Sequence, residues 1–116
     1  MIDHVFAGLP VAEVDAARAW YERFVGRAPD LMPNDNEAAW RLTDKGWLYI
    51  VGDAQRAGAG LLTLLVDDVD EWIADLARRG LAPDAIETIP GAVREAVNVD
   101  PDGNRITVGQ PLGAGG

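Results

Sequence analysis

Apolar residues recur along this chain at the spacing of helices and strands. Val14, Ala17, Tyr21 and Phe24 lie three or four residues apart, which predicts an amphipathic helix with one buried face. Gly26 suits the left-handed residue that commonly ends a helix. The first half of the chain therefore contains one helix, which follows an apolar strand.

A second helix is predicted after Asp68, which has capping-box spacing to Glu71. Its apolar stripe consists of Val69, Trp72, Ile73 and Leu76. Gly80 suits the end of this helix. A strand precedes each helix, at 2–10 and 61–66, and three short strands follow each one. The predicted order is therefore β-α-β-β-β, twice.

The sequence itself repeats in the same order as these elements. The matched segments are 11–15 (VAEVD) with 66–70 (VDDVD) and 26–30 (GRAPD) with 80–84 (GLAPD). Ordered matches of this kind indicate two copies of one supersecondary unit. We therefore predict a single domain over 1–110 with halves 1–56 and 57–110, and a flexible tail at 111–116.

Charge and composition exclude several classes of partner. The formal net charge is −9, whereas nucleic-acid binding needs a basic surface. No apolar run approaches the roughly 20 residues needed to cross a bilayer, and the first residues lack the pattern of a signal peptide. The absence of cysteine excludes disulfides and cysteine metal sites. We expect a cytoplasmic protein without nucleic-acid or membrane partners.

The turns predict which side chains share a face of each sheet. A four-residue loop at 43–46 would place Trp40, Leu42, Trp47 and Tyr49 on one face, with Leu48 and Ile50 on the face toward the helix. A one-residue slip would exchange the two faces.

In the second half, the segment 100–104 (DPDGN) is interpreted as a structural turn, because Pro fixes one φ angle and Gly permits a positive one. A five-residue loop here sets Val99 against Arg105 and Val97 against Thr107. Glu95 then shares their face, whereas Ile106 and Val108 face the helix.

Three segments resemble motifs of one family. Ala19–Gly26 (AWYERFVG), Val66–Asp70 (VDDVD) and Asp100–Ile106 (DPDGNRI) are similar to motifs of the glyoxalase/bleomycin resistance protein/dioxygenase superfamily, also called the vicinal oxygen chelate superfamily. The resemblance implies an α+β fold in which two tandem βαβββ modules place curved mixed sheets around a cleft. Because the family contains isomerases, dioxygenases and drug-sequestering proteins, function has to be inferred from the site.

Metal-dependent members of this family carry ligands on the first and last strand of each half. The resemblance places Phe6, Tyr49, Leu61 and Thr107 at these four positions. His4 would replace Phe6 only if Gly8–Pro10 were a local insertion. Since a divalent ion needs several nitrogen or carboxylate donors, we expect no metal and no cofactor.

The remaining candidates suggest three functions. The first is a metal-free cleft that binds a small aromatic or cationic molecule, as in bleomycin resistance; its predicted ligand-binding residues are Phe6, Trp40, Trp47, Tyr49, Leu61, Arg105 and Thr107. The second is a metal-independent isomerase or lyase with Glu95 or His4 as acid/base. The third is a non-catalytic interaction or regulatory domain. Relatives of this kind are often dimers, so a homodimer is one candidate state. The oligomeric state stays open, as does whether the protein is an enzyme.

Two candidates also have structural interpretations. Arg105 could anchor an anionic ligand or pair with an aspartate of its own turn. Trp40, Trp47 and Tyr49 could equally be core residues.

Overall fold

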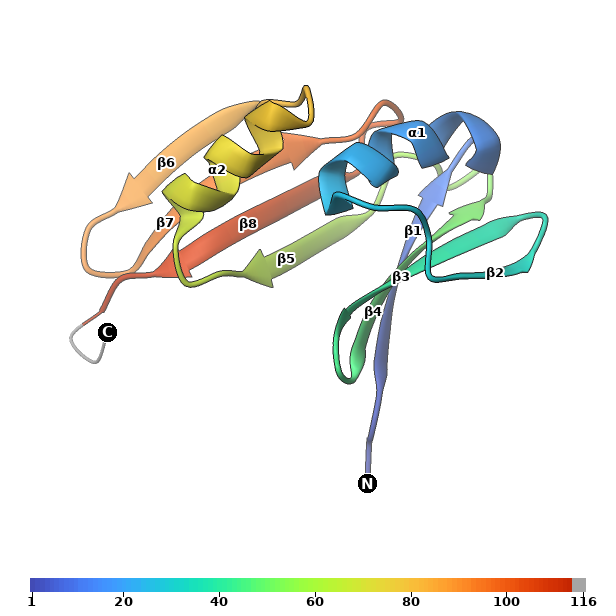
Figure 1. Ribbon diagram of the computed structural model, residues 1–116, viewed down its shortest axis with the longest axis horizontal. Coiled ribbons are helices and arrows are strands. Elements are labelled where there is room, and N and C mark those ends of the chain that lie inside the picture. The colour runs from blue at the N-terminus through green and yellow to red at the C-terminus, as the bar shows by residue number, and fades with distance from the viewer. Residues whose placement is uncertain (114–116) are drawn as a thin grey trace.

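The protein is described by a computed structural model over residues 1–113, and it is an α+β chain of two similar halves (Figure 1). The first half consists of β1 (Val5–Val11), α1 (Val14–Val25), β2 (Leu31–Asn34), β3 (Glu37–Thr43) and β4 (Gly46–Gly52). The second half consists of β5 (Leu61–Leu65), α2 (Val69–Arg78), β6 (Ala85–Ile89), β7 (Val93–Val99) and β8 (Arg105–Pro111). The predicted β-α-β-β-β repeat is confirmed.

Each half forms one four-stranded sheet. Sheet 1 has the order β1-β4-β3-β2 and sheet 2 the equivalent order β5-β8-β7-β6. In both sheets the first strand of the half pairs parallel with the last, and the other pairs are antiparallel. The predicted α+β class with mixed sheets is confirmed, and the strands of the described residues form no closed barrel.

The helices begin and end as the sequence predicts. Helix α1 buries Val14, Ala17, Tyr21 and Phe24. It ends at Gly26, whose φ of 97° is left-handed and whose N–H donates to the Glu22 carbonyl. Helix α2 begins after Asp68, whose carboxylate accepts the Glu71 N–H at 3.0 Å. Capping and buried stripes therefore fix both helices locally.

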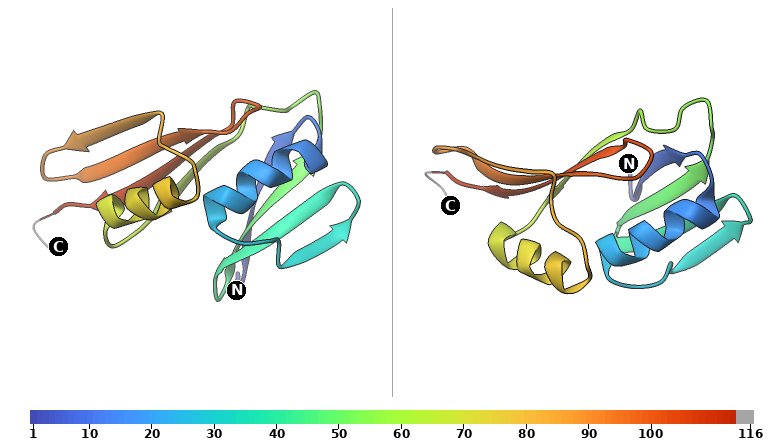
Figure 2. Two further views of the ribbon diagram at one scale, coloured as in Figure 1. Left: turned by 45° about the horizontal axis from the view of Figure 1, so that its top comes forward. Right: turned by 90° about the horizontal axis from the view of Figure 1, so that it is seen from above.

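Both helices lie side by side on the same side of the molecule (Figure 2). The rings of Phe24 and Trp72 meet edge to face at 5.4 Å, and the Arg79 guanidinium donates to the Phe24 carbonyl at 3.0 Å. One hydrophobic core runs through both halves beneath the helices. The face of each sheet that points away from its helix, here called the open face, is therefore exposed in a single chain. One chain does not close the cleft that the sequence pattern predicts between these faces.

A buried hydrogen-bond network joins the two halves at the 100–104 turn. Asp100 Oδ1 accepts the backbone N–H groups of residues 102, 103 and 104, which confirms the structural interpretation of this turn. Asp100 Oδ2 accepts from the Tyr21 hydroxyl at 2.6 Å and from Asn104 Nδ2 at 2.8 Å. Asn104 Nδ2 also donates to the Pro10 carbonyl at 2.7 Å. Burial and the bond to Asp100 raise the pKa of the Tyr21 phenol far above its ordinary value.

The β3–β4 hairpin differs from the prediction by one residue. Thr43 pairs with Gly46 around a two-residue loop, but Arg41 then pairs with Trp47, because Leu42 is an extra, bulged residue. The prediction that Trp40 lies on the open face is therefore wrong. Trp40 pairs with Leu48, is fully buried beneath α1 and donates its indole N–H to the Arg27 carbonyl at 2.9 Å. Leu42 packs against the core instead of lining the open face.

The β7–β8 hairpin follows the prediction. Val99 pairs with Arg105 and Val97 with Thr107, and Ile106 and Val108 are buried on the helix side. Beyond this hairpin, Pro111 still pairs with Val93 and the Leu112 N–H donates to the Ala92 carbonyl at 2.7 Å, so the ordered domain continues past the predicted end at residue 110. Residues 114–116 of the predicted tail lie outside the described residues.

Neither helix is long and apolar enough to span a membrane, within residues 1–113.

Candidate ligand-binding site

Three aromatic side chains share the open face of sheet 1. Phe6 pairs with Trp47 across the parallel β1–β4 ladder, and their rings stack at 5.6 Å with an interplanar angle of 20°. Phe6 is 54 % exposed, so much of its ring is open to solvent in a single chain. Tyr49 follows on β4, two residues along. We call Phe6, Trp47 and Tyr49 the aromatic platform.

Tyr49 lies across Gly8, and only glycine fits beneath it. A Cβ at residue 8 would come within 2.3 Å of the Tyr49 ring. The side chain that residue 8 lacks is thus replaced by the Tyr49 ring, which lies along the sheet. This contact orients Tyr49 beside the Phe6–Trp47 pair and extends the platform along β1 and β4.

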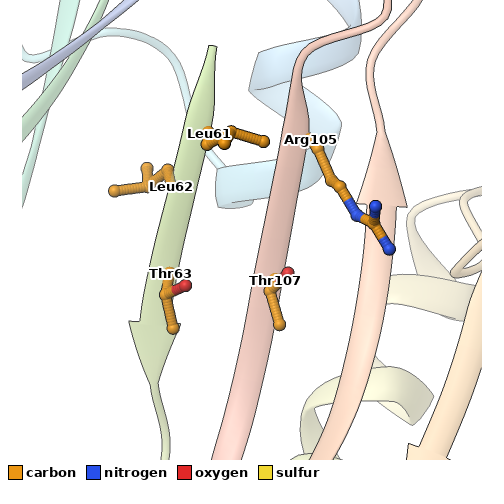
Figure 3. Close-up of a pocket in the computed structure, with 5 residues that line it drawn as sticks. All are labelled: Leu61, Leu62, Thr63, Arg105 and Thr107. Carbon is orange, nitrogen blue, oxygen red and sulfur yellow. The ribbon is translucent and has the colours of Figure 1, made fainter.

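The open face of sheet 2 carries a different set of side chains at the equivalent positions. Leu61 pairs with Arg105 and Thr63 with Thr107 across the parallel β5–β8 ladder. These four residues and Leu62 line a hollow of about 310 Å³ (Figure 3). We call Leu61, Thr63, Arg105 and Thr107 the arginine patch.

The strand registers show which of His4 and Phe6 occupies the family's first ligand position in the first half of the chain. β1 pairs with β4 from Val5 to Val11 without interruption, so Gly8–Pro10 is not an insertion. Phe6 pairs with Trp47 as Leu61 pairs with Arg105, and Phe6 therefore holds the position equivalent to Leu61. His4 precedes β1, is exposed, and has its Nδ1 2.8 Å from the carboxylate of Asp3.

The residues at the family's metal positions do not fit a divalent ion. Phe6 and Leu61 offer no donor atom, and Tyr49 and Thr107 offer only hydroxyls. Nor do three or more His, Cys, Asp or Glu side chains converge anywhere within the described part of the chain. Because such an ion needs several nitrogen or carboxylate ligands, the side chains at these four positions do not supply its ligand set.

The two candidate acid/base residues lie in different halves. His4 precedes the first strand of sheet 1, whereas Glu95 lies on β7 of sheet 2, half-buried on the open face. The strand register sets Glu95 directly opposite Glu87, a neighbour that the sequence pattern did not reveal. A single chain therefore does not bring His4 and Glu95 into one catalytic site.

Two further site residues were not predicted, Gly8 and Thr63. The repeat aligns Gly8 with Thr63, and both occupy the open face two residues after the family's first ligand position in their half. Aligning the two halves of the sequence could have found both residues. A position on the open face that holds Gly in one half and a hydroxyl side chain in the other indicates that the two open faces carry different side chains.

Comparison with solved structures identifies the family. A glyoxalase/bleomycin resistance protein from Catenulispora acidiphila DSM 44928 is 36% identical, with a TM-score of 0.88 over 92% of this chain and 96% of that one. TnmS3, an antibiotic binding protein from Streptomyces sp. CB03234, is 30% identical, with a TM-score of 0.73 over 95% and 97%. A bleomycin-binding protein complexed with bleomycin shares the fold at 22% identity, with a TM-score of 0.75 over 94% and 98%.

No family model matches the sequence, and a search of curated proteins finds no match. The structural comparison is nevertheless decisive, since a relative 36% identical is covered almost completely. This chain belongs to the glyoxalase/bleomycin resistance protein family, and the resemblance of its motifs to that superfamily is confirmed.

Proposed function

We propose that this protein binds a small aromatic or cationic molecule without a metal ion and sequesters it. The observation that carries the proposal is the stacked Phe6–Trp47 pair on the open face of sheet 1, in which Phe6 is exposed and Trp47 is half-buried. Aromatic rings offer large apolar areas with few rotatable bonds, and their faces attract both other rings and cations. The antibiotic-binding relative at 30% identity supports sequestration as the purpose.

A second copy of the chain completes the cleft in this proposal. Large apolar side chains cover both open faces: Phe6 is 54% exposed, Leu61 79% and Leu65 66%. Exposed apolar area of this kind favours an interface. Sheet 1 of one copy facing sheet 2 of the other would enclose a ligand between the aromatic platform and the arginine patch, with Phe6, Trp47, Tyr49, Leu61, Arg105 and Thr107 as the lining.

The dimer can be tested by sedimentation equilibrium. Leu65→Glu introduces a charge on the open face of sheet 2 and should convert the dimer to monomer. Ala74→Glu makes the same change at an exposed position of α2 and should leave the dimer intact. A wild-type chain that is monomeric at ligand-binding concentrations would contradict this part of the proposal.

Binding is favoured over catalysis by the surroundings of Glu95. The carboxylate that it faces across the strands belongs to Glu87, and the described residues place no cation in an ion pair with either. A metal-independent isomerase or lyase would need a second group positioned to act on the same substrate. We further propose that the protein acts in the cytoplasm, in keeping with its lack of cysteine.

Tryptophan fluorescence tests the binding site. An aromatic probe such as 2-naphthamide should quench the emission saturably, and Trp47→Ala should weaken binding by about 1–3 kcal/mol if the ring is a buried anchor. Trp20→Ala is the matched control, because Trp20 is equally half-buried but stacks on Phe24 in the helix. Equal affinities of Trp47→Ala and wild type would refute the proposed site.

A further inference from the structure

Building on the proposed function, we infer that Arg105 makes the site selective for aromatic molecules that carry an anionic group, such as a carboxylate. The ring of such a molecule would lie on the aromatic platform, and its anionic group would bind the guanidinium of the arginine patch. The inference goes beyond the proposed binding of an aromatic molecule, because it assigns a ligand group to the arginine patch on sheet 2.

The guanidinium of Arg105 has no acidic partner within residues 1–113, although acidic residues outnumber basic ones by 19 to 10. Seven of the ten basic side chains pair with a carboxylate, namely Arg18, Arg27, Arg41, Lys45, Arg56, Arg78 and Arg94. In a chain with this excess of acid, an arginine that avoids ion pairs on a ligand-facing surface is available for a ligand.

Arg105 does not form an ion pair with an aspartate of its own turn, which was the structural alternative for this residue. Asp100 is buried, and its two oxygens already accept hydrogen bonds from Tyr21, from Asn104 and from three backbone N–H groups. Asp102 forms no ion pair with Arg105 either. The Asp100 carboxylate is therefore bound within the turn, and neither aspartate of the turn holds the Arg105 guanidinium.

Arg41, on the open face of sheet 1, has a structural role and serves as a comparison for Arg105. Arg41 lies beside Trp47 on sheet 1, and its guanidinium donates to the carbonyls of Thr43 and Asp44 at 3.3 and 2.9 Å. It also lies 3.7 Å from the Asp44 carboxylate. Arg41 is thus occupied by its own hairpin, whereas no equivalent contacts from residues 1–113 hold Arg105.

Thr107, two residues along β8 from Arg105, adds a hydroxyl group to the same face of sheet 2. Thr63 and Thr107 are direct neighbours on β5 and β8, on the same face as Arg105, and the Arg105 side chain extends from β8 toward β7 (Figure 3). A guanidinium presents a planar fork of N–H donors that matches a carboxylate, and threonine hydroxyls add single donors. Leu61 supplies apolar surface for the ring-bearing end.

The charges on sheet 2 also orient a ligand. Glu95 pairs with Gly109, four residues from Arg105 along β8, which is roughly 13 Å at the rise of a strand. Glu87 lies directly opposite Glu95. The two carboxylates repel an anion from that end of the open face, so the anionic group is directed to the end beside the 100–104 turn.

Enclosure strengthens this selectivity. If a second copy covers the open face, the Arg105 guanidinium loses water, and its donors require an acceptor in place of it. An anionic ligand provides that acceptor in a site where charge-assisted hydrogen bonds are stronger than in water.

The test compares two probes of the same shape, 2-naphthoate and 2-naphthamide, by calorimetric titration of the full chain. Wild type should bind the carboxylate at least about tenfold more tightly than the amide, since hydrogen bonds to charged groups exceed neutral ones. Raising the salt concentration should reduce this preference. Arg105→Gln should lower the ratio of carboxylate to amide affinity to about one. Arg23→Gln, at an exposed position on α1, should keep the wild-type preference.

The other possible outcomes separate failure of the inference from failure of the proposed function. Equal binding of both probes to wild type, or a preference that survives Arg105→Gln, overturns the inference while leaving the proposed function intact. Loss of the dimer in Arg105→Gln, measured by sedimentation, would show that Arg105 pairs with the second copy, which also overturns it. Failure of both probes to bind wild type refutes the proposed aromatic binding itself and the inference with it.

Discussion

The Tyr21 hydroxyl donates a 2.6 Å hydrogen bond to Asp100, and this contact connects helix α1 of the first half with the β7–β8 turn of the second. Both residues are buried, at 0% and 3% exposure. Tyr21→Phe removes the donor and leaves a buried carboxylate oxygen with one partner fewer, so it should destabilise the fold by about 1–3 kcal/mol. Urea unfolding measures this difference.

Arg56→Gln provides the control, because Arg56 pairs with Asp53 at 3.6 Å on the surface and is highly exposed. That change should cost less than about 1 kcal/mol. If Tyr21→Phe were no more destabilising than Arg56→Gln, the bond would not be the connection between the halves that its geometry indicates.

Because of the bulge at Leu42, Trp40 and Trp47 lie on opposite faces of sheet 1, and replacing them should reduce stability to different extents. Trp40 is fully buried under α1 and bonded to the Arg27 carbonyl, so Trp40→Ala should destabilise the protein by about 3–5 kcal/mol. Trp47 lies on the open face, and Trp47→Ala should cost much less stability while weakening ligand binding. Thermal unfolding of the two variants distinguishes them, and similar losses of stability would contradict the register.

Gly8→Ala should displace the Tyr49 ring, because the new Cβ would lie 2.3 Å from it. We expect a destabilisation of about 1–3 kcal/mol, typical of overpacking, and weaker binding of an aromatic probe. The double variant Gly8→Ala/Tyr49→Ala should recover stability relative to Gly8→Ala, since the clash is gone. A double variant less stable than both single variants would show that the ring does not lie over Gly8.

The pKa values of two surface carboxylates should change by different amounts when the arginine beside each one is replaced. The pKa of Asp70 is lowered by its hydrogen bond to Arg94, and the pKa of Asp30 is lowered first by the backbone N–H of Arg41 and then by Arg27. Arg94→Gln should therefore return the Asp70 pKa to its ordinary value near 3.8, whereas Arg27→Gln should raise that of Asp30 only in part.

NMR titration of the side-chain carboxyl groups measures both shifts. Because the folded pKa is depressed, each carboxylate stabilises the native state fully above its ordinary pKa, and this contribution is lost as the pH falls through the lower folded value. Full recovery of the Asp30 pKa in Arg27→Gln would assign the shift to the ion pair rather than to the backbone.

How far the sequence predicts the site depends on the turn in each half. The segment Asp100–Asn104 combines Pro, Gly and two Asp residues, which specify a five-residue loop, and the faces of β7 and β8 were predicted correctly from it. The β3–β4 turn was also located correctly, but a bulged Leu42 leaves no mark in a hairpin that is apolar on both faces. Trp40 and Trp47 therefore could not be assigned to opposite faces.

The relative placement of the two sheets was also beyond the sequence pattern. Periodicity identifies the face of each sheet that packs on a helix, but it does not specify whether the remaining faces meet within one chain. That depends on contacts such as Arg79 with the Phe24 carbonyl and Tyr21 with Asp100, which connect residues far apart in the sequence.

In the proposed function, an aromatic ligand binds on the open face of sheet 1 without a metal ion. The most direct measurement follows the indole N–H signals of the ¹⁵N-labelled protein during titration with 2-naphthamide in the presence of EDTA. We predict a saturable shift of the Trp47 signal, with no shift of Trp40, whose N–H is bonded to Arg27 in the core. A saturable shift at Trp40 or at Trp72 with Trp47 unmoved, or binding that disappears in EDTA, would contradict the account.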